Sequence, residues 1–201
     1  RGGTVERLSV QALAQEGGDG SAVLHTDQGP RRADYAVVAA GAFSHHLSRT
    51  LGEPVPLETE RGYNTTLPAG AFDLRLHLTF SGHGFVVTSN KGGVRVGGAV
   101  ELGGLDLPPD YRRSDILLNK AAQFMPGLKT EGGQRWMGFR PSLPDSMPLI
   151  DRSARASRVI YAFGHGHSGL TQAAATAEIV ADLIARAAPA IDLFPFRLTR
   201  F

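Results

Sequence analysis

The chain has 201 residues, 42% of them hydrophobic and 20% charged, with a net charge of +2. This length allows one large domain or two small ones with a buried core, and the composition is typical of a soluble globular protein. The basic residues are mostly arginine and are scattered along the chain, which argues against nucleic-acid binding. The absence of cysteine excludes disulfides, thiolate metal sites and a cysteine nucleophile, and no apolar run is long enough to span a membrane.

The first third of the chain predicts two strands joined by a glycine-rich turn at residues 17–20, then a buried strand and a short helix. The buried strand is wholly apolar, as is usual in a parallel sheet, and it ends in residues small enough for a ligand or a helix to approach closely. The expected elements are strands at 4–15, 22–27 and 35–41 and a helix at 43–51, with a turn at 28–30.

The remaining two thirds predict an antiparallel sheet with one helix, followed by a last strand and helix. Asn90-Lys91-Gly92-Gly93 is a hairpin signal, and Ser114 is placed to cap a helix. Three prolines stiffen a loop expected at 140–150. The expected elements are strands at 57–67, 76–80, 84–89, 93–100, 134–139 and 159–163 and helices at 115–124 and 170–188, with a tail at 189–201.

This order predicts an α/β protein with α+β character, made of two lobes. A β-meander, the final strand and the final helix would form one lobe, and the antiparallel sheet would form the other. We therefore expect residues 1–52 and 135–201 to share a lobe and residues 53–134 to form the second one.

Arg140 is the charged residue most suited to bind a substrate. It follows an apolar strand and precedes Pro141, which favours extended backbone at Arg140. Arginine offers a planar fork that holds a carboxylate through two parallel hydrogen bonds. The alternative is an arginine tied up inside its own loop by Asp145, Asp151 or a carbonyl group. Tyr63 is likewise either a pocket residue or a core aromatic of its strand.

The stretch Gly164-His165-Gly166-His167-Ser168-Gly169-Leu170-Thr171 joins the last strand to the last helix. A strand that turns through glycines into a helix start presents backbone N–H groups at the positive end of the helix dipole, which suits an anion or an electron-rich ring. The alternative is a turn in which glycine serves backbone shape only. The two histidines lack further ligands at metal-binding spacing, so we expect no metal. Ser168 misses the Gly-x-Ser-x-Gly nucleophile pattern by one residue, and an N-cap role fits it better.

Three stretches together resemble the superfamily of FAD-dependent D-amino acid oxidases and dehydrogenases, and most of all its bacterial D-amino acid dehydrogenase branch. They are residues 33–42 (ADYAVVAAGA), residues 138–150 (GFRPSLPDSMPLI) and residues 164–171 (GHGHSGLT). Pro56 to Tyr63 also fits the point at which the family's substrate domain begins. The resemblance covers essentially the whole chain.

The resemblance implies an enzyme of amino-acid catabolism that transfers a hydride from a D-amino acid to FAD, giving a 2-oxo acid and ammonia. Arg140 would act as the catalytic residue that binds the substrate carboxylate, with Tyr63 as a second substrate-binding residue. The residues expected to contact FAD are Ala40, Gly41, Pro141, Gly164, His165, Gly166, His167, Ser168, Gly169, Leu170 and Thr171.

The family begins with a strand–Gly-x-Gly-x-x-Gly–helix unit that holds the FAD pyrophosphate. That N-terminal unit is expected to lie upstream of Arg1, because Gly17-Gly18-Asp19-Gly20 lacks the spacing. The chain thus resembles a C-terminal fragment, inactive alone, whose partners would be a D-amino acid and the missing N-terminal half or a partner subunit. The resemblance places it in the cytoplasm, or peripherally on the inner membrane beside a quinone chain. The alternatives are an oxidase of a secondary amine of the sarcosine or proline type and a non-enzymatic substrate-domain or assembly module.

Overall fold

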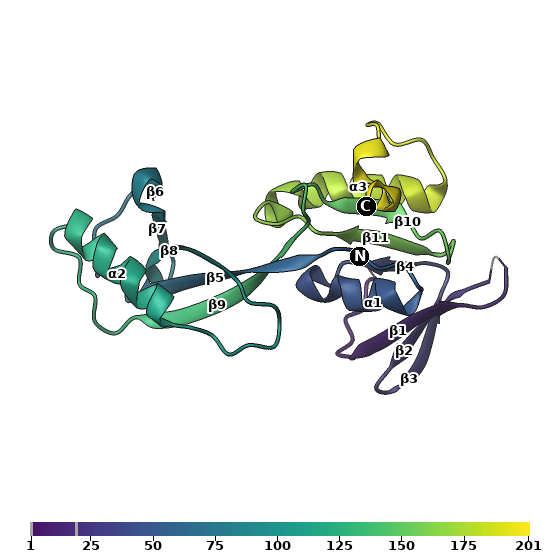
Figure 1. Ribbon diagram of the computed structural model, residues 1–201, viewed down its shortest axis with the longest axis horizontal. Coiled ribbons are helices and arrows are strands. Elements are labelled where there is room, and N and C mark those ends of the chain that lie inside the picture. The colour runs from purple at the N-terminus through teal and green to yellow at the C-terminus, as the bar shows by residue number, and fades with distance from the viewer. Residues whose placement is uncertain (1, 19) are drawn as a thin grey trace. The chain divides into compact units, whose positions relative to one another are not determined.

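The computed structural model describes residues 2–18 and 20–201 (Figure 1), so Asp19 of the predicted turn lies outside the described residues. Contacts between residues divide the chain into two compact units. The first unit comprises Arg1–Glu58 and Pro141–Phe201, and the second comprises Thr59–Arg140. The unit boundaries therefore fall after Glu58 and after Arg140, a few residues beyond the positions taken from the sequence.

The first sheet of the first unit is an antiparallel meander with the order β1-β2-β3. Its strands are β1 (Val10–Gln15), β2 (Ala22–Thr26) and β3 (Gly29–Ala33). The prediction of a strand from residue 4 was wrong, because pairing with β2 begins only at Val10. The prediction of a turn at residues 28–30 missed β3, whose residues are all exposed. An edge strand of this kind tolerates Pro30, since its missing N–H is not needed by a further strand.

The second sheet of the first unit has the order β10-β11-β4. Its strands are β4 (Ala36–Val38), β10 (Leu149–Arg152) and β11 (Val159–Phe163). The strand predicted at 35–41, β4, is parallel as expected and pairs with the fully buried β11, with Ala36 opposite Val159. It is shorter than predicted, and Val37 at its centre is exposed. The end of the loop expected at 140–150 is instead β10, which pairs antiparallel with β11. The strand β4 is one of the two edge strands of this sheet among the described residues.

Helices and 3₁₀ turns complete the first unit. The predicted helix at 43–51 is a 3₁₀ turn at Gly41–Phe43 followed by α1 (Ser44–Thr50), and the last helix is α3 (Gly169–Ala185). The tail forms 3₁₀ turns at Phe194–Phe196 and Leu198–Arg200. The tail is held by a hydrogen bond of 2.9 Å from the Leu198 N–H to Asp151 and by an ion pair of 2.7 Å between Arg200 and Asp145.

A buried carboxylate joins distant parts of the first unit. Glu53 is 6% exposed, and its carboxylate accepts hydrogen bonds from the Tyr161 hydroxyl at 2.5 Å, the Ser153 hydroxyl at 2.6 Å and the Ala154 N–H at 2.7 Å. Burial, together with the neighbouring Glu53 charge, raises the pKa of Tyr161. The segment that leaves α1 is thereby fixed to β11 and the turn before it.

The second unit is built on a five-stranded sheet with the order β6-β7-β8-β5-β9. Its elements are β5 (Glu58–Leu67), β6 (Leu78–Phe80), β7 (Phe85–Asn90), β8 (Gly93–Leu102), β9 (Gln134–Ser142) and the helix α2 (Arg112–Phe124), with a 3₁₀ turn at Ser81–His83. The hairpin predicted at Asn90 joins β7 to β8. The helix starts earlier than predicted, and Ser114 lies buried within it rather than at its N-cap. β9 also runs three residues further than predicted, through Arg140 and Pro141.

One face of this sheet is covered by α2, and the other face carries Gly62, Trp136 and Arg140. Leu67 of β5 and Val94 and Val96 of β8 pack with Leu117 and Ala121 of α2 in a common core. Because side chains alternate along a strand, the even-numbered residues of β5 lie on the opposite face. On that face the apolar side chains of Val100, Leu102 and Trp136 are 44%, 72% and 59% exposed.

Candidate functional site

Arg140 is the last residue of the second unit and lies near the end of β9. Its Nη1 atom is buried and makes no hydrogen bond to any residue that the structure describes. Burial lowers the pKa of the Arg140 guanidinium, and the charge of Glu60 opposes that shift. A guanidinium stays protonated under such conditions, so Arg140 is a partly desolvated cation with a donor left over.

The two carboxylates that were considered as loop partners of Arg140 are bonded elsewhere. Asp145 forms its ion pair with Arg200, and the bond holds the pKa of Asp145 below its usual value. Asp151 accepts hydrogen bonds from the N–H groups of Arg152 and Leu198. Both carboxylates thus have partners of their own within the first unit.

Near Arg140, two planar side chains pack directly over glycine residues of the sheet. A Cβ atom added to Gly62 of β5 would overlap Cζ, Nη1 and Nη2 of Arg140. In the same way, a Cβ added to Gly138 would overlap the indole ring of Trp136. Beyond Trp136 a cavity of about 360 Å³ has polar walls, formed by Asn64, Thr66, Arg95, Gln134, Arg135 and Trp136. A guanidinium, an indole and a polar hollow thus share one region of the second unit.

Tyr63 lies in a polar network on the helix-covered side of the sheet. It is 1% exposed, and its hydroxyl donates to Glu101 at 2.5 Å and accepts the N–H of Asp110 at 3.1 Å. Burial and the bond to Glu101 raise the pKa of Tyr63. Its role in substrate binding stays a prediction, and these contacts favour an indirect role.

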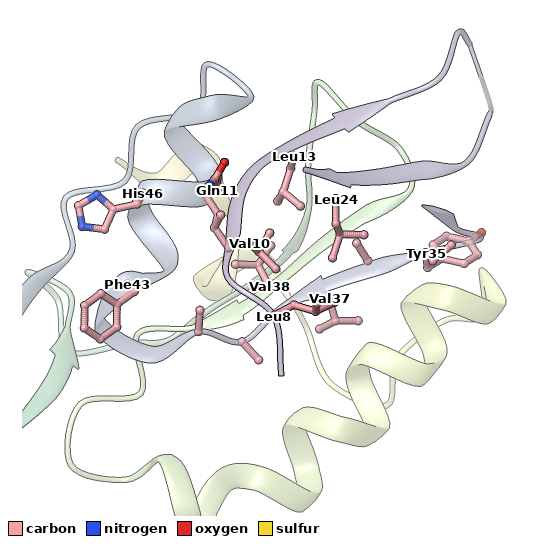
Figure 2. Close-up of a pocket in the computed structure, with 15 residues that line it drawn as sticks. Leu8, Val10, Gln11, Leu13, Leu24, Tyr35, Val37, Val38, Phe43 and His46 are labelled. Carbon is pink, nitrogen blue, oxygen red and sulfur yellow. The ribbon is translucent and has the colours of Figure 1, made fainter. Parts of the chain in front are cut away.

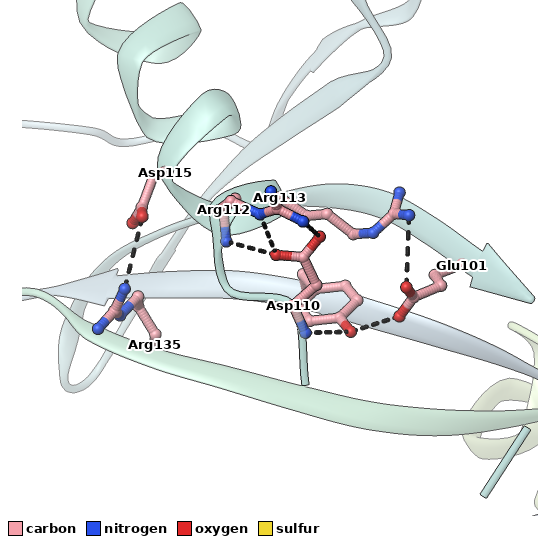
Figure 3. Close-up of polar contacts among 7 residues, drawn as sticks. Glu101, Asp110, Arg112, Arg113, Asp115 and Arg135 are labelled. Atoms are coloured by element: carbon pink, nitrogen blue, oxygen red, sulfur yellow. Dashed lines mark hydrogen bonds and ion pairs between the residues drawn. The ribbon is translucent and has the colours of Figure 1, made fainter. Parts of the chain in front are cut away.

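Glu101 is the centre of that network (Figure 3). Its carboxylate lies 3.3 Å from Nη2 of Arg113, as Figure 3 shows. It also lies 3.5 Å from Nη1 of Arg61, which is fully buried. Arg61 also donates to the carbonyl of Leu107 at 2.7 Å. These contacts hold the loop before α2 against β5, and they were not predicted because no local spacing links the residues.

In the first unit, β11 runs into α3 through the glycine-rich turn. Gly164 and Gly166 adopt positive φ values of 85° and 52°, a conformation that favours glycine. Ser168 occupies the predicted N-cap position, although its side chain makes no capping bond to the described residues. The first N–H groups of α3 thus remain oriented toward the turn, as at any helix start that lacks a side-chain cap.

The glycines of this turn have a spacing that sequence reasoning overlooked. Gly164, Gly166 and Gly169 form a Gly-x-Gly-x-x-Gly pattern, and it directly follows a buried strand and opens a helix. This is the local context in which such a pattern binds a dinucleotide. No parallel strand follows α3 in the described part of the chain, so the turn is a strand–helix unit rather than a complete βαβ unit.

The turn is tied to the residues that follow Arg140. The Gly166 N–H donates to the carbonyl of Pro141 at 2.7 Å, and Ser142 forms a β-bridge with His165. The His165 ring lies 3.0 Å from the hydroxyl of Thr176 on α3, and burial lowers the pKa of His165. His167, Ser168, Leu170 and Thr171 are exposed.

The end of β4 adjoins a cavity of about 700 Å³ (Figure 2). Ala39 and Ala40 line it together with apolar side chains of β1, β2 and α1, among them Val10, Leu24 and Leu47. Gly41 follows with a positive φ of 56°. A second, apolar cavity of about 380 Å³ lies between β4, β11 and α3. Volumes of this size lie in the range of small-molecule and cofactor sites.

Two further properties concern the described residues as a whole. They contain no group of three or more His, Asp or Glu side chains arranged to hold a metal ion. None of their helices is both long and apolar enough to cross a membrane.

Comparison with known proteins identifies the family. Residues 1–183 match the FAD dependent oxidoreductase family. The D-amino-acid oxidase of Bradyrhizobium diazoefficiens is 40% identical over 205 residues, which cover 100% of this chain and 48% of that protein. The D-amino acid dehydrogenase of Paramagnetospirillum magneticum is 32% identical over 199 residues, covering 96% of this chain and 46% of that protein. The chain thus spans about half the length of these relatives.

Solved structures give the same result. The chain superimposes on glycine oxidase from Geobacillus kaustophilus with a TM-score of 0.84 and 25% identity, over 96% of this chain and 52% of that one. L-Proline dehydrogenase from P. horikoshii shares the fold, with a TM-score of 0.80 at 22% identity, over 96% of this chain and 54% of that one. The fold is therefore that of flavoprotein amino acid oxidases, which confirms the predicted mixed α/β class. The chain belongs to the family of FAD-dependent oxidoreductases, and its curated relatives are named D-amino acid oxidases and dehydrogenases.

The residues present fit FAD. The turn from Gly164 to Gly169 combines left-handed glycines with an uncapped helix start, which suits a phosphate or a ring that gains negative charge. Ala39, Ala40 and Gly41 are small and border a cavity large enough for part of a dinucleotide. No acidic residue belongs to either of these two segments.

Proposed function

We propose that this chain provides the substrate-binding sheet and the flavin-binding turn of an enzyme that oxidises D-amino acids. The observation that carries the proposal is the half-buried Arg140, whose Nη1 has no hydrogen-bond partner among the described residues. A buried donor of this kind is costly unless a ligand satisfies it. A carboxylate satisfies it best, because it matches the guanidinium fork and neutralises its charge.

In this proposal Arg140 binds the carboxylate of the amino acid and fixes the direction of its Cα–H bond. FAD, when bound, supplies the chemistry of accepting a hydride from that carbon. The substrate also loses a proton from nitrogen, and water hydrolyses the resulting imino acid to a 2-oxo acid and ammonia. The role of Arg140 is thus orientation, which contributes to the rate by holding the reacting atoms in line.

The residues proposed to contact FAD are those of the turn and of the β4 end. The N–H groups at the start of α3 would stabilise negative charge that develops on the flavin, as a preorganised positive dipole does. His165 would be neutral there, because burial lowers its pKa. Pro141 would belong to the same site, since its carbonyl already accepts the Gly166 N–H.

The free edge of β4 supports a further part of the proposal, namely that polypeptide outside this chain completes the dinucleotide site. β4 is paired on one side only in the described sheet, and Val37 is 43% exposed although it lies in an apolar strand. Val37 and Ala39 line both cavities beside this strand. A strand that paired with β4 would cover these surfaces and remove an unprotected edge. The polypeptide would be an N-terminal half or a partner subunit.

The test is flavin reduction in the FAD-loaded protein that contains this chain. We expect anaerobic D-alanine to bleach the visible flavin absorbance and L-alanine to do so far more slowly. Arg140→Met should raise KM for D-alanine by about 100-fold, because a charged hydrogen-bonding partner is lost. The matched control is Arg75→Met, which removes an exposed arginine of the same unit outside the polar cavity beside Trp136 and should change KM less than about threefold. An unchanged KM in Arg140→Met would refute the proposal.

A further inference from the structure

The guanidinium of Arg140 lies flat against the backbone of β5. Its Cζ, Nη1 and Nη2 atoms are equally close to the position that a Cβ of residue 62 would occupy. A point that is 2.3 Å from all three atoms cannot lie in the plane of the guanidinium, so it lies above that plane on the side of Nη1 and Nη2. Gly62 is buried, although its neighbours Glu60 and Asn64 on the same face are only partly buried. Gly62 therefore lies beneath the face of the guanidinium.

Any side chain at residue 62 would displace the guanidinium of Arg140 from this position. Carbon atoms in contact are about 3.5–4.0 Å apart, so any Cβ would lift the guanidinium by roughly 1 Å or more. The requirement does not come from backbone conformation, because the φ of Gly62 lies outside the left-handed range in which glycine is favoured. Glycine inside a strand normally lowers stability. This loss of stability is explained if the guanidinium of Arg140 needs the space that a side chain at residue 62 would fill.

The orientation of the guanidinium has a chemical consequence. A guanidinium donates hydrogen bonds from its edge and none from its face. With the face against Gly62, the N–H donors of Arg140 point along the plane of the guanidinium rather than into the backbone of β5, so a carboxylate must meet Arg140 at this edge. The neighbouring pair of Trp136 and Gly138 repeats the arrangement, since the indole also occupies the place of a missing Cβ. Each of these two planar side chains thus lies close to the sheet backbone, in the space that the absent Cβ of a glycine leaves open.

We propose that Gly62 is a positioning residue, which sets the height and tilt of Arg140 so that its fork meets the substrate carboxylate. This inference rests on the proposed function, because it assumes that Arg140 binds that carboxylate. It assigns a role to a residue with no reactive group, and it makes the sheet backbone part of the substrate site.

The experiment is a double-mutant cycle in the FAD-loaded protein. The variants are Gly62→Ala, Arg140→Lys and the combination, with Gly92→Ala as the control glycine in the β7–β8 turn of the same sheet. A Cβ at residue 92 makes only an ordinary contact of 3.6 Å with Asn90. The readouts are kcat/KM for D-alanine, the Kd of pyruvate by calorimetry and the FAD content.

We expect Gly62→Ala to lower kcat/KM for D-alanine by about 10- to 100-fold, because a displacement of about 1 Å at a positioning group has effects of this order. The Kd of pyruvate should rise in parallel, with unchanged FAD content. In the Arg140→Lys background, Gly62→Ala should change kcat/KM for D-alanine by less than about twofold. The reason is that a lysine ammonium has no planar face to pack against residue 62. Gly92→Ala should behave as the wild type.

Two results would overturn the inference: a Gly62→Ala enzyme within twofold of the wild type, or an alanine effect of the same size in both backgrounds. A different result concerns the proposed function alone. If Arg140→Lys binds pyruvate and turns over D-alanine as the wild type does, Arg140 is not the carboxylate ligand.

A stability measurement covers the case in which Gly62→Ala does not fold. Removal of the guanidinium by Arg140→Met leaves room for a Cβ at residue 62. The double variant Gly62→Ala/Arg140→Met should then fold with the Tm of Arg140→Met. A double variant that also fails to fold would show that the alanine clashes with something other than Arg140, and the inference would be wrong.

Discussion

Replacing Tyr161 by phenylalanine tests the buried carboxylate of the first unit. The substitution removes one hydroxyl and keeps the ring, which lies edge-on to Phe163 at 5.7 Å. The lost bond is the one of 2.5 Å from Tyr161 to Glu53, and bonds to a charged group contribute about 1.5–3 kcal/mol. Glu53 keeps its bonds to Ser153 and Ala154, so its charge is not left without partners.

We therefore expect Tyr161→Phe to lower the free energy of unfolding of the first unit by about 2 kcal/mol. Such a loss should accelerate hydrogen exchange of the β10 and β11 amides by roughly 30-fold at neutral pH. Hydrogen exchange read by mass spectrometry localises the effect to these strands. The control is Tyr35→Phe, which alters a partly exposed tyrosine of the same unit. It should change the free energy of unfolding that exchange reports by less than about 0.5 kcal/mol.

The same variant predicts a pH dependence with a definite sign. The folded state raises the pKa of Tyr161 above its usual 10.0, so the folded protein keeps the phenolic proton when the unfolded chain loses it. The stabilisation is complete below pH 10 and decreases above it, by up to about 1.4 kcal/mol per pH unit. Urea unfolding followed by circular dichroism should show the gap between wild type and Tyr161→Phe narrowing above pH 10. A gap that stays constant across that range, or one below about 0.5 kcal/mol at neutral pH, would refute the reasoning.

Two more substitutions test the site regions. Glu101→Gln leaves the fully buried Arg61 without its carboxylate and should destabilise the second unit by about 3 kcal/mol, read as faster amide exchange in β5 and β8. A loss below about 1 kcal/mol would mean that the ion pair contributes little. Gly164→Ala places a Cβ at a φ of 85° and against the side chain of Leu143, and should lower the unfolding free energy by about 1–3 kcal/mol in thermal melts. Gly17→Ala, which meets open space, is its control and should melt as the wild type does.

Local patterns were sufficient for the elements whose signals lie within a few residues. Asn90 and Gly93 defined a hairpin because the turn type is set by the turn residues themselves. The apolar run Val159 to Phe163 followed by glycines defined β11 and the start of α3 for the same reason. The Gly-x-Gly-x-x-Gly spacing of residues 164–169 is likewise a local signal, because all three glycines lie within six consecutive residues.

Other features depend on partners far away in the sequence. Pro30 suggested a turn, yet it lies in β3 because an edge strand does not use the missing N–H. Pro141 suggested the end of β9, yet the strand continues to Ser142. The extended backbone of Arg140 was predictable from Pro141, whereas its place within β9 and its contact with Gly62 were not. That contact exists only because β5 and β9 are adjacent in the sheet.

The adjacency of β5 and β9 also bears on how such proteins vary. The chain passes from the first unit to the second at the start of β5 and returns at the end of β9, and these strands are neighbours. Neighbouring strands lie about 5 Å apart, so the second unit is an insertion whose two ends almost meet. A different sheet, or a short linker, could join the same two ends without changing the path of the chain through the first unit. Sequence change in the second unit thus leaves the connections of the first unit intact.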